Sequence, residues 1–200
     1  SERVVASLRE HLSPELLRWV AACALYPELH WDLTLCLGDA LSDAGSPPLP
    51  TFENIAALAR LPWFRNGIMP NGVRSQLLEP QVLSEDERRR ARGAILRVLE
   101  ENVPDNPRSY AFDEHRLHLA IHHLMLARMP QEKQHWLRQY RELHAQGIRG
   151  DQVSVVELDR HFNRLLDFPL PQRLRDFLFP EGRRVLGLKP RIPLLFAAGL

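Results

Sequence analysis

The sequence predicts a mainly α-helical protein with one short β-hairpin in its first half and a helical bundle in its second half. Two observations favour helices. Apolar residues recur every three or four positions over long stretches, and Ser, Thr or Pro stands where most of these stretches begin. The one clear signal for β-structure is Asn66-Gly67, which lies between two short apolar or aromatic pieces.

Three helices are expected before the hairpin. Ser13, followed by proline, is typical of an N-cap with proline at the first helical position. A second helix is expected over residues 31–41. Thr51 caps a third helix that stops before Pro62, because proline cannot continue a helix.

The hairpin is expected at residues 61–70, because Asn-Gly accepts the positive φ that a two-residue turn needs. It supplies the candidate interaction residues Trp63, Phe64, Arg65 and Asn66. The two aromatic side chains either stack on a ligand or pack on the preceding helices, and packing is favoured, with Arg65 and Asn66 exposed at the tip. A short helix over residues 71–78 follows.

The second half is expected to be helical throughout. Ser84 and Glu87 form a capping box at the start of a strong helix. Residues 102–109 contain two prolines and are interpreted as a linker, which predicts two subdomains, 1–103 and 104–200. Three more helices are expected: one capped by Asp113, one from Pro130 to Gly147, and one over residues 153–164 that could also be a strand. A short helix from Pro171 completes the expected elements.

Composition narrows the possible functions. The chain has 200 residues, with 26 basic and 25 acidic side chains and a net charge of +1, so nucleic acid is not the favoured partner. Two cysteines, Cys23 and Cys36, exclude a disulfide framework and a four-cysteine zinc site. No signal peptide opens the sequence, and no apolar run reaches the roughly 18 residues of a membrane span. A cytoplasmic protein is expected.

Four histidines on one expected helix raise the question of a metal site. His115, His118 and His122 lie three and four positions apart, which places them on one helix face. The zinc-protease pattern needs glutamate after the first histidine of its pair, and here Leu119 follows His118. A solvated helix face is therefore preferred, with no metal bound, and the role of the cluster from His115 to His123 stays open.

No other motif points to catalysis. The chain has no Gly-x-Ser-x-Gly elbow and no glycine-rich phosphate loop. Cys23 and Cys36 fall on apolar helix faces, where a thiol behaves as a small hydrophobic group. We therefore expect no enzymatic activity and no cofactor. An enzyme that binds a metal through His118 and His122 remains the second alternative.

The densest basic run covers residues 88–92, directly after three acidic residues on the same helix. Pairs such as Glu85 with Arg89 favour a solvated, self-compensated face over a phosphate-binding patch. The C-terminus combines basic residues from Arg173 to Arg191 with an apolar run over residues 192–200. This end either docks on the core or marks the cytoplasmic edge of a membrane segment.

Three helices, a hairpin and further helices follow one another in the order of a winged-helix domain. Within that order, residues 13–101 resemble the winged-helix segment of signal-transduction ATPases with numerous domains. The matching stretches are residues 16–27, 30–35 and 58–64. The resemblance implies a regulatory module that lies beside an ATPase, effector or sensor part of a larger bacterial signalling or defence protein. The nucleotide-binding motifs of that family are absent from this sequence, so nucleotide binding is not implied.

The function expected from the sequence is therefore a non-catalytic regulatory or protein-interaction module. It would transmit a conformational state between neighbouring domains or to a partner subunit, with a membrane contact through the C-terminal tail as a further possibility. The first alternative is a DNA-binding winged-helix regulator that uses Arg65, Asn66 and the run at residues 88–92. This alternative has little support from the expected third helix, residues 51–61, where Arg60 is the one basic residue.

Overall fold

The computed structural model describes residues 2–43 and 47–165, and these residues form helices and loops without a strand. The mainly α-helical class is confirmed. The helices are α1 (Glu2–His11), α2 (Pro14–Cys23), α3 (Trp31–Leu41), α4 (Phe52–Ala59), α5 (Pro62–Asn66), α6 (Asn71–Leu77), α7 (Glu85–Glu101), α8 (Tyr110–Leu126), α9 (Pro130–Ala145) and α10 (Gln152–Leu165). The expected helix at Pro171 and the C-terminal tail lie outside the described residues.

The chain divides into two units, Ser1–Ser154 and Val155–Leu200. The first unit contains α1 to α9 and the first turn of α10. The second unit contains the rest of α10, which is described to residue 165. The sequence-based division at residues 103 and 104 stays a prediction.

Side-chain caps fix the starts of three expected helices. The Ser13 hydroxyl accepts the Leu16 amide at the start of α2, and Thr51 caps α4 in the same way. Ser84 and Glu87 form the expected capping box at α7, with each side chain bonded to the other residue's backbone amide. Each cap satisfies amides that a helix start leaves without a partner.

The expected hairpin is not formed. Residues 62–66 form the short helix α5, and Gly67 ends it in the left-handed conformation at φ 72°. Pro62 starts the helical turn, and Gly67 accepts the positive φ that is common after a helix. The segment then makes a single bridge, in which the Leu29 amide donates to the Gly67 carbonyl at 2.7 Å. Asn-Gly thus serves as a helix end, which is the second common use of a positive-φ glycine.

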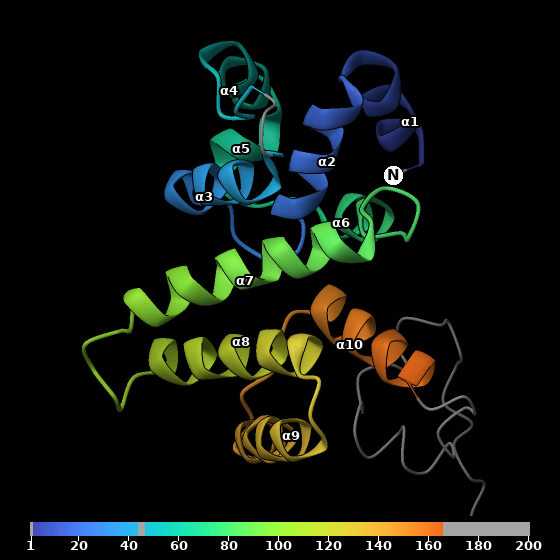
Figure 1. The fold of residues 1–200 in the computed structure, drawn as a ribbon. Coiled ribbons are helices and arrows are strands. Elements are labelled where there is room, and N and C mark those ends of the chain that lie inside the picture. Colours follow the sequence, from blue (N-terminus) through green and yellow to red (C-terminus); the bar gives the residue numbers. More distant parts are fainter. Residues whose placement is uncertain (1, 44–46, 166–200) are drawn as a thin grey trace, which may run out of the picture. The chain divides into compact units, whose positions relative to one another are not determined.

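In the first unit α7 lies between α3 and α8, and α9 packs on α8 (Figure 1). The core around α2 centres on Trp19, which is fully buried and donates from Nε1 to the Thr34 carbonyl at 2.7 Å. Gly38 of α3 makes this packing possible, because a Cβ there would lie 2.7 Å from the Trp19 ring. The α8–α9 contact includes His123 stacked on Trp136, with ring centroids 3.9 Å apart.

The helix that carries the histidine cluster begins earlier than expected. Ser109, not Asp113, is the N-cap of α8, and its hydroxyl accepts the Phe112 amide. The earlier start adds a turn to α8 and leaves Asp113 inside the first turn, where a carboxylate is favoured by the helix dipole. No helix in the described part of the chain is both long and apolar enough to cross a bilayer.

Candidate functional site: a buried histidine and arginine cluster beside a pocket

The four candidate interaction residues separate into two buried and two exposed side chains. Trp63 and Phe64 are buried on α5, and Phe64 packs against Trp31 with ring centroids 5.7 Å apart. Arg65 and Asn66 are exposed. The aromatic pair is thus buried and Arg65 and Asn66 are exposed, as expected, but these residues form a helix and not a hairpin.

A surface forms where α5 meets the segment before α3. Trp31 is 39% exposed and Ile68 is 64% exposed, and the bridge between residues 28 and 68 connects their two segments. Arg65 lies on the same α5–Ile68 segment and is exposed. We call these three side chains the Trp31–Ile68 surface.

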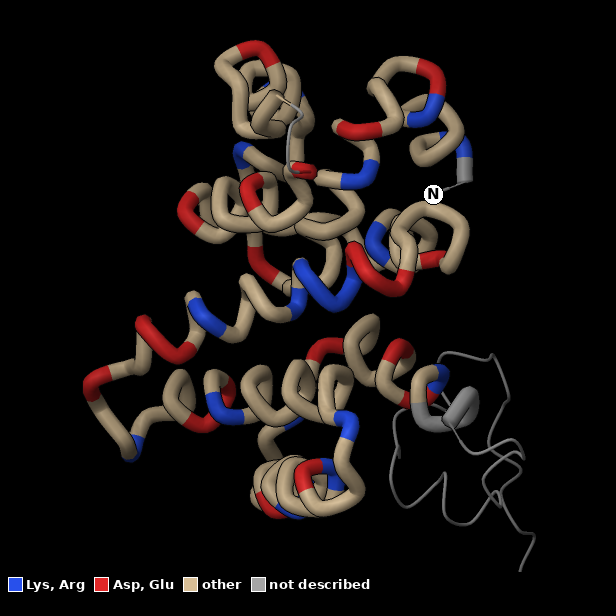
Figure 2. The backbone as a smooth tube through the Cα atoms, in the orientation of Figure 1, with Lys and Arg blue, Asp and Glu red and all other residues tan. Residues whose placement is uncertain are grey.

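The basic run at residues 88–92 is bound largely to the chain itself. Arg88 is buried and donates from one nitrogen to the carbonyls of Leu78 and Glu79, at 2.7 and 2.9 Å. Arg90 pairs with Asp43, and Arg92 is 3% exposed. The interpretation as a solvated face is thus wrong for Arg88 and Arg92. Their guanidinium groups bond α7 to neighbouring segments. Figure 2 shows the run as one basic stretch of α7, with acidic residues at both ends of the helix.

The three histidines of α8 are buried, so the interpretation as a solvated face is wrong for them too. His115, His118 and His122 are 8%, 4% and 1% exposed. Their face of α8 turns toward Tyr26, whose ring centroid lies 4.9 Å from that of His118. Spacing along the helix gave the shared face correctly. The mixture of histidines and apolar residues along the helix did not reveal whether this face is buried or exposed.

Arg92 and His122 form the innermost contact of this cluster. The Arg92 Nη1 atom lies 3.0 Å from His122 Nδ1. Since a guanidinium only donates, His122 must accept through an unprotonated Nδ1. Burial and the adjacent charge of Arg92 hold the pKa of His122 well below its usual value, so the imidazole stays neutral.

Arg74 and Asp151 form a second buried contact, which joins α6 to the start of α10. Their side chains approach to 2.6 Å, and Arg74 also donates from Nε to the Ala24 carbonyl at 3.1 Å. Asp151 in turn accepts the amides of Val153 and Ser154. Burial alone would raise the pKa of Asp151, but Arg74 and these hydrogen bonds hold it below its usual value.

His118 lies within the electrostatic reach of the Arg74–Asp151 contact, and it also lowers the pKa of His122. Burial lowers its pKa, Asp151 and Glu28 raise it, and Arg74 lowers it, with a net decrease. Its Nδ1 atom is buried without a hydrogen-bond partner. The α8 histidines are therefore neutral groups between two buried cations, an arrangement that stabilises one fixed packing of α6, α7 and α8.

A pocket of about 290 Å³ opens beside this cluster, between the end of α2, α3, α7 and α8. We call it the Tyr26–His115 pocket. Its apolar wall consists of Leu33, Ile95, Val98 and Leu99. Its polar wall consists of Tyr26, His30, Asp32, Asn102 and His115. The pocket adjoins the buried cluster, because His115 belongs to both and Tyr26 contacts His118 and His122.

The polar wall of the pocket has an excess of acidic groups around it. Burial and the charges of Glu28, Glu114 and Asp151 raise the pKa of Tyr26 to about 12. Burial and Glu28 likewise raise the pKa of Glu114. Glu28 pairs with His30 at 2.9 Å. Within the described chain, Asp32 and Glu114 make no ion pair that would neutralise them.

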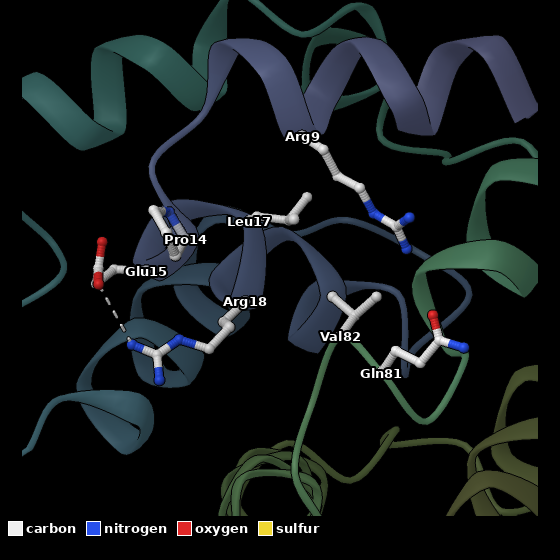
Figure 3. Close-up of a pocket in the computed structure, with 7 residues that line it drawn as sticks. All are labelled: Arg9, Pro14, Glu15, Leu17, Arg18, Gln81 and Val82. Atoms are coloured by element: carbon white, nitrogen blue, oxygen red, sulfur yellow. Dashed lines mark ion pairs between the residues drawn. The ribbon is translucent and has the colours of Figure 1, made fainter.

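A larger pocket of about 510 Å³ lies between α1, α2 and the segment before α7. Figure 3 shows the Arg18 guanidinium turned toward Glu15, with Arg9 on the opposite wall. Arg18 also donates to Glu87 at 2.9 Å, which links α2 to the capping box of α7. Its charge thus interacts with two carboxylates within the fold, and its Nε atom is buried without a hydrogen-bond partner.

The Cys23 thiol stays protonated, and the described residues form no group that could hold a metal ion. Burial raises the pKa of the Cys23 thiol to about 12, so almost no thiolate forms near neutral pH. Among residues 2–43 and 47–165, no three His, Cys, Asp or Glu side chains are placed to hold a metal ion.

Sequence reasoning missed Arg74, Asp151 and Tyr26. Arg74 lies on a short polar helix, and Asp151 lies in a loop 77 positions away, so no local pattern connects them. One signal was available: Arg74 stands between two apolar residues, Val73 and Leu77, that are buried on the same helix. Comparison of the chain with protein-family models, curated proteins and solved structures finds no match.

Proposed function

We propose that this chain is a non-catalytic protein-interaction module that binds its partner through the Trp31–Ile68 surface. One observation carries the proposal. Two large apolar side chains, Trp31 and Ile68, are exposed on adjoining segments, next to the exposed guanidinium of Arg65. Tryptophan and arginine are the residues that most often dominate the binding energy of protein interfaces.

The Trp31–Ile68 surface is also held in a fixed arrangement before a partner binds. Phe64 is buried beneath the Trp31 ring, and the Leu29–Gly67 hydrogen bond holds the two segments together. A partner that buries these side chains therefore immobilises little that is not already fixed, which lowers the entropic cost of binding.

The chemistry of the surface indicates the chemistry of the partner. Trp31 and Ile68 need apolar contacts, and Arg65 makes no ion pair within the described residues. We therefore infer a protein segment that combines apolar side chains with a carboxylate that faces Arg65. Of the arginines that a DNA-binding role would use, Arg88 and Arg92 are buried and bonded within the chain.

The likeness to signal-transduction ATPases extends this proposal. It adds the prediction that the partner is a neighbouring domain of a larger bacterial signalling or defence protein, and that docking transmits a conformational state. The winged-helix arrangement, the cytoplasmic location and the membrane contact of the C-terminal tail belong to the same set of predictions. The buried arginines and histidines support the part of the proposal in which the module holds one conformational state, because their burial fixes one packing of α6, α7 and α8.

Site-specific crosslinking in the source cells tests the proposal. A photo-crosslinking amino acid in place of Ile68 should capture one partner, which mass spectrometry identifies. The same amino acid in place of Glu142, an exposed residue of α9, is the matched control. Reconstitution with the purified partner then measures the dissociation constant.

Binding to that partner should weaken about tenfold or more for Arg65→Glu and for Ile68→Ser, since hot-spot residues contribute roughly 2 kcal/mol or more. Arg138→Glu, a charge reversal at an exposed position of α9, should leave it unchanged. The proposal fails if positions 68 and 142 capture the same proteins, or if Arg65→Glu and Arg138→Glu have equal effects. Capture of a second copy of the chain would identify the partner as the protein itself.

A further inference from the structure

We propose that the Tyr26–His115 pocket binds a small ligand in which an apolar body carries a positively charged amine or guanidinium group. The inference goes beyond the proposed function, because none of the residues of the Trp31–Ile68 surface lines this pocket. It rests on the size of the pocket, the nature of its two walls and the charges around its polar wall.

The size and the apolar wall set the body of the ligand. About 290 Å³ is at the low end of ligand pockets, which run from roughly 300 to 1,000 Å³. A single aromatic ring fits a cavity of about 150 Å³, so the pocket holds one ring or a short aliphatic chain with a polar head. Leu33, Ile95, Val98 and Leu99 provide the apolar contacts for that body.

The acidic groups around the polar wall determine which charge the polar head of the ligand carries. Asp32 lies in the polar wall, and Glu28 and Glu114 lie close enough to raise the pKa of the Tyr26 hydroxyl. The two arginines of the buried cluster are engaged elsewhere: Arg74 pairs with Asp151, and Arg92 bonds to His122. Neither arginine lines the pocket. A cation entering the pocket therefore meets carboxylates, whereas an anion is repelled.

His115 adds a neutral polar group to the wall. It lines the pocket and is 8% exposed. Burial lowers its pKa, so the ring is neutral near pH 7. The ring therefore adds no positive charge that would repel a cationic head group.

Three probes of similar size and different charge test the inference. Benzylamine, benzyl alcohol and benzoate are titrated into the full chain, and binding is followed by NMR chemical-shift changes at residues of the pocket. We expect benzylamine to bind more tightly than benzyl alcohol, and benzoate to cause no shift. Equal binding of benzoate and benzylamine, or no shift with benzylamine, would overturn the inference.

Two variants locate the site and one controls for charge. Asp32→Asn should weaken benzylamine about threefold to fivefold, as expected for loss of a partly exposed ion pair, and should leave benzyl alcohol unchanged. Asp39→Asn, at an exposed position of the same helix, should change neither. Val98→Phe fills the pocket and should abolish both. If Asp39→Asn acts as strongly as Asp32→Asn, the effect is one of overall charge and the inference is wrong.

Two sources could present this chemistry: a free small amine, or an arginine side chain of a protein segment. Arginine with an acetylated amino end and an amidated carboxyl end serves as the second probe. Tighter binding of benzylamine identifies a free amine, and tighter binding of the capped arginine identifies a protein side chain. Either result supports the cation pocket. Since Arg65→Glu and Ile68→Ser lie outside the pocket, failure of the partner experiment and failure of this one are separate.

Discussion

The Arg92 guanidinium donates to His122 Nδ1 across 3.0 Å in the buried contact between α7 and α8. A buried cation is ordinarily paired with a carboxylate. A neutral imidazole is one of the partners of Arg92, and His118 and Arg74 lie close enough to lower the pKa of His122 further. The contact holds only while His122 is neutral. It therefore makes the fold sensitive to pH.

Acid should destabilise the protein in a defined range. The pKa values of His115, His118, His122 and His123 are all lowered in the folded protein. The unfolded chain binds protons at these side chains from about pH 6.5 downward, whereas the folded protein binds them only at lower pH. The stabilisation that depends on these histidines being neutral should thus be complete above about pH 6.5. Below that pH, the free energy of unfolding should decrease by up to about 1.4 kcal/mol per pH unit for each histidine. Urea unfolding between about pH 7.5 and pH 5 measures this slope.

His122→Gln should reduce that dependence on pH. The glutamine carbonyl can accept from Arg92 and cannot be protonated, so one proton is removed from the linkage. The slope below about pH 6.5 should decrease by up to about 1.4 kcal/mol per pH unit. His11→Gln, an exchange at an exposed position of α1, is the matched control. Equal slopes for the wild-type protein and His122→Gln would mean that His122 is not the titrating group.

Removal of Arg74 should be strongly destabilising. Arg74→Met leaves Asp151 without its ion-pair partner in a largely buried position, and such a loss costs about 3–5 kcal/mol. Adding Asp151→Asn removes the stranded charge and retains an oxygen for the Val153 and Ser154 amides, so the double variant should recover part of the loss. Arg90→Met breaks an exposed pair with Asp43 and should cost about 1 kcal/mol or less. Similar losses for Arg74→Met and Arg90→Met would contradict this account.

Two glycines within helices should respond to alanine in opposite directions. A Cβ at Gly38 would lie 2.7 Å from the Trp19 ring and 2.8 Å from Pro50, so Gly38→Ala should cost about 1–3 kcal/mol. A Cβ at Gly93 meets nothing within 4 Å, so Gly93→Ala should stabilise α7 by about 0.5–1 kcal/mol. Thermal unfolding of the two variants gives the comparison. A shift of the same sign for both would show that the packing at Trp19 differs from the one described.

A binding experiment with duplex DNA distinguishes the proposed protein-interaction function from the DNA-binding alternative. Arg88 and Arg92 donate to groups within the fold, so they are not free to neutralise phosphates. Fluorescence anisotropy with a labelled random duplex should show no binding at micromolar protein, even at low salt where phosphate contacts are strongest. Binding that weakens as salt is raised, and that Arg65→Ala reduces, would favour the DNA-binding alternative instead.

Local signals predicted local structure well. Ser13, Thr51 and Ser84 were identified as caps because a cap depends on residues within one turn. The Asn66-Gly67 pair was misjudged for the same reason, since a positive φ suits both a hairpin turn and a helix end. What decided between them was Pro62 and the burial of Trp63 and Phe64 against the core, which are properties of the tertiary structure.

The candidate site was harder to foresee. Polar patterning suggests exposure, and the α8 histidines and the α7 arginines are polar residues that the fold buries. Their burial depends on mutual contacts between helices distant in sequence, such as Arg92 with His122, and no spacing rule encodes such pairs. The pocket likewise combines residues from four segments, and no local pattern indicates that acidic groups surround its polar wall.

The protonation of the α8 histidines tests the central claim, that they are neutral structural groups held between buried arginines. Nitrogen-15 NMR of the imidazole rings near pH 7 reports directly which nitrogen carries a proton. The account predicts a neutral His122 with Nδ1 unprotonated and accepting from Arg92, and a neutral His115 at the pocket wall. A charged His122, or a His122 that is protonated on Nδ1, would contradict the arrangement from which the acid sensitivity was inferred.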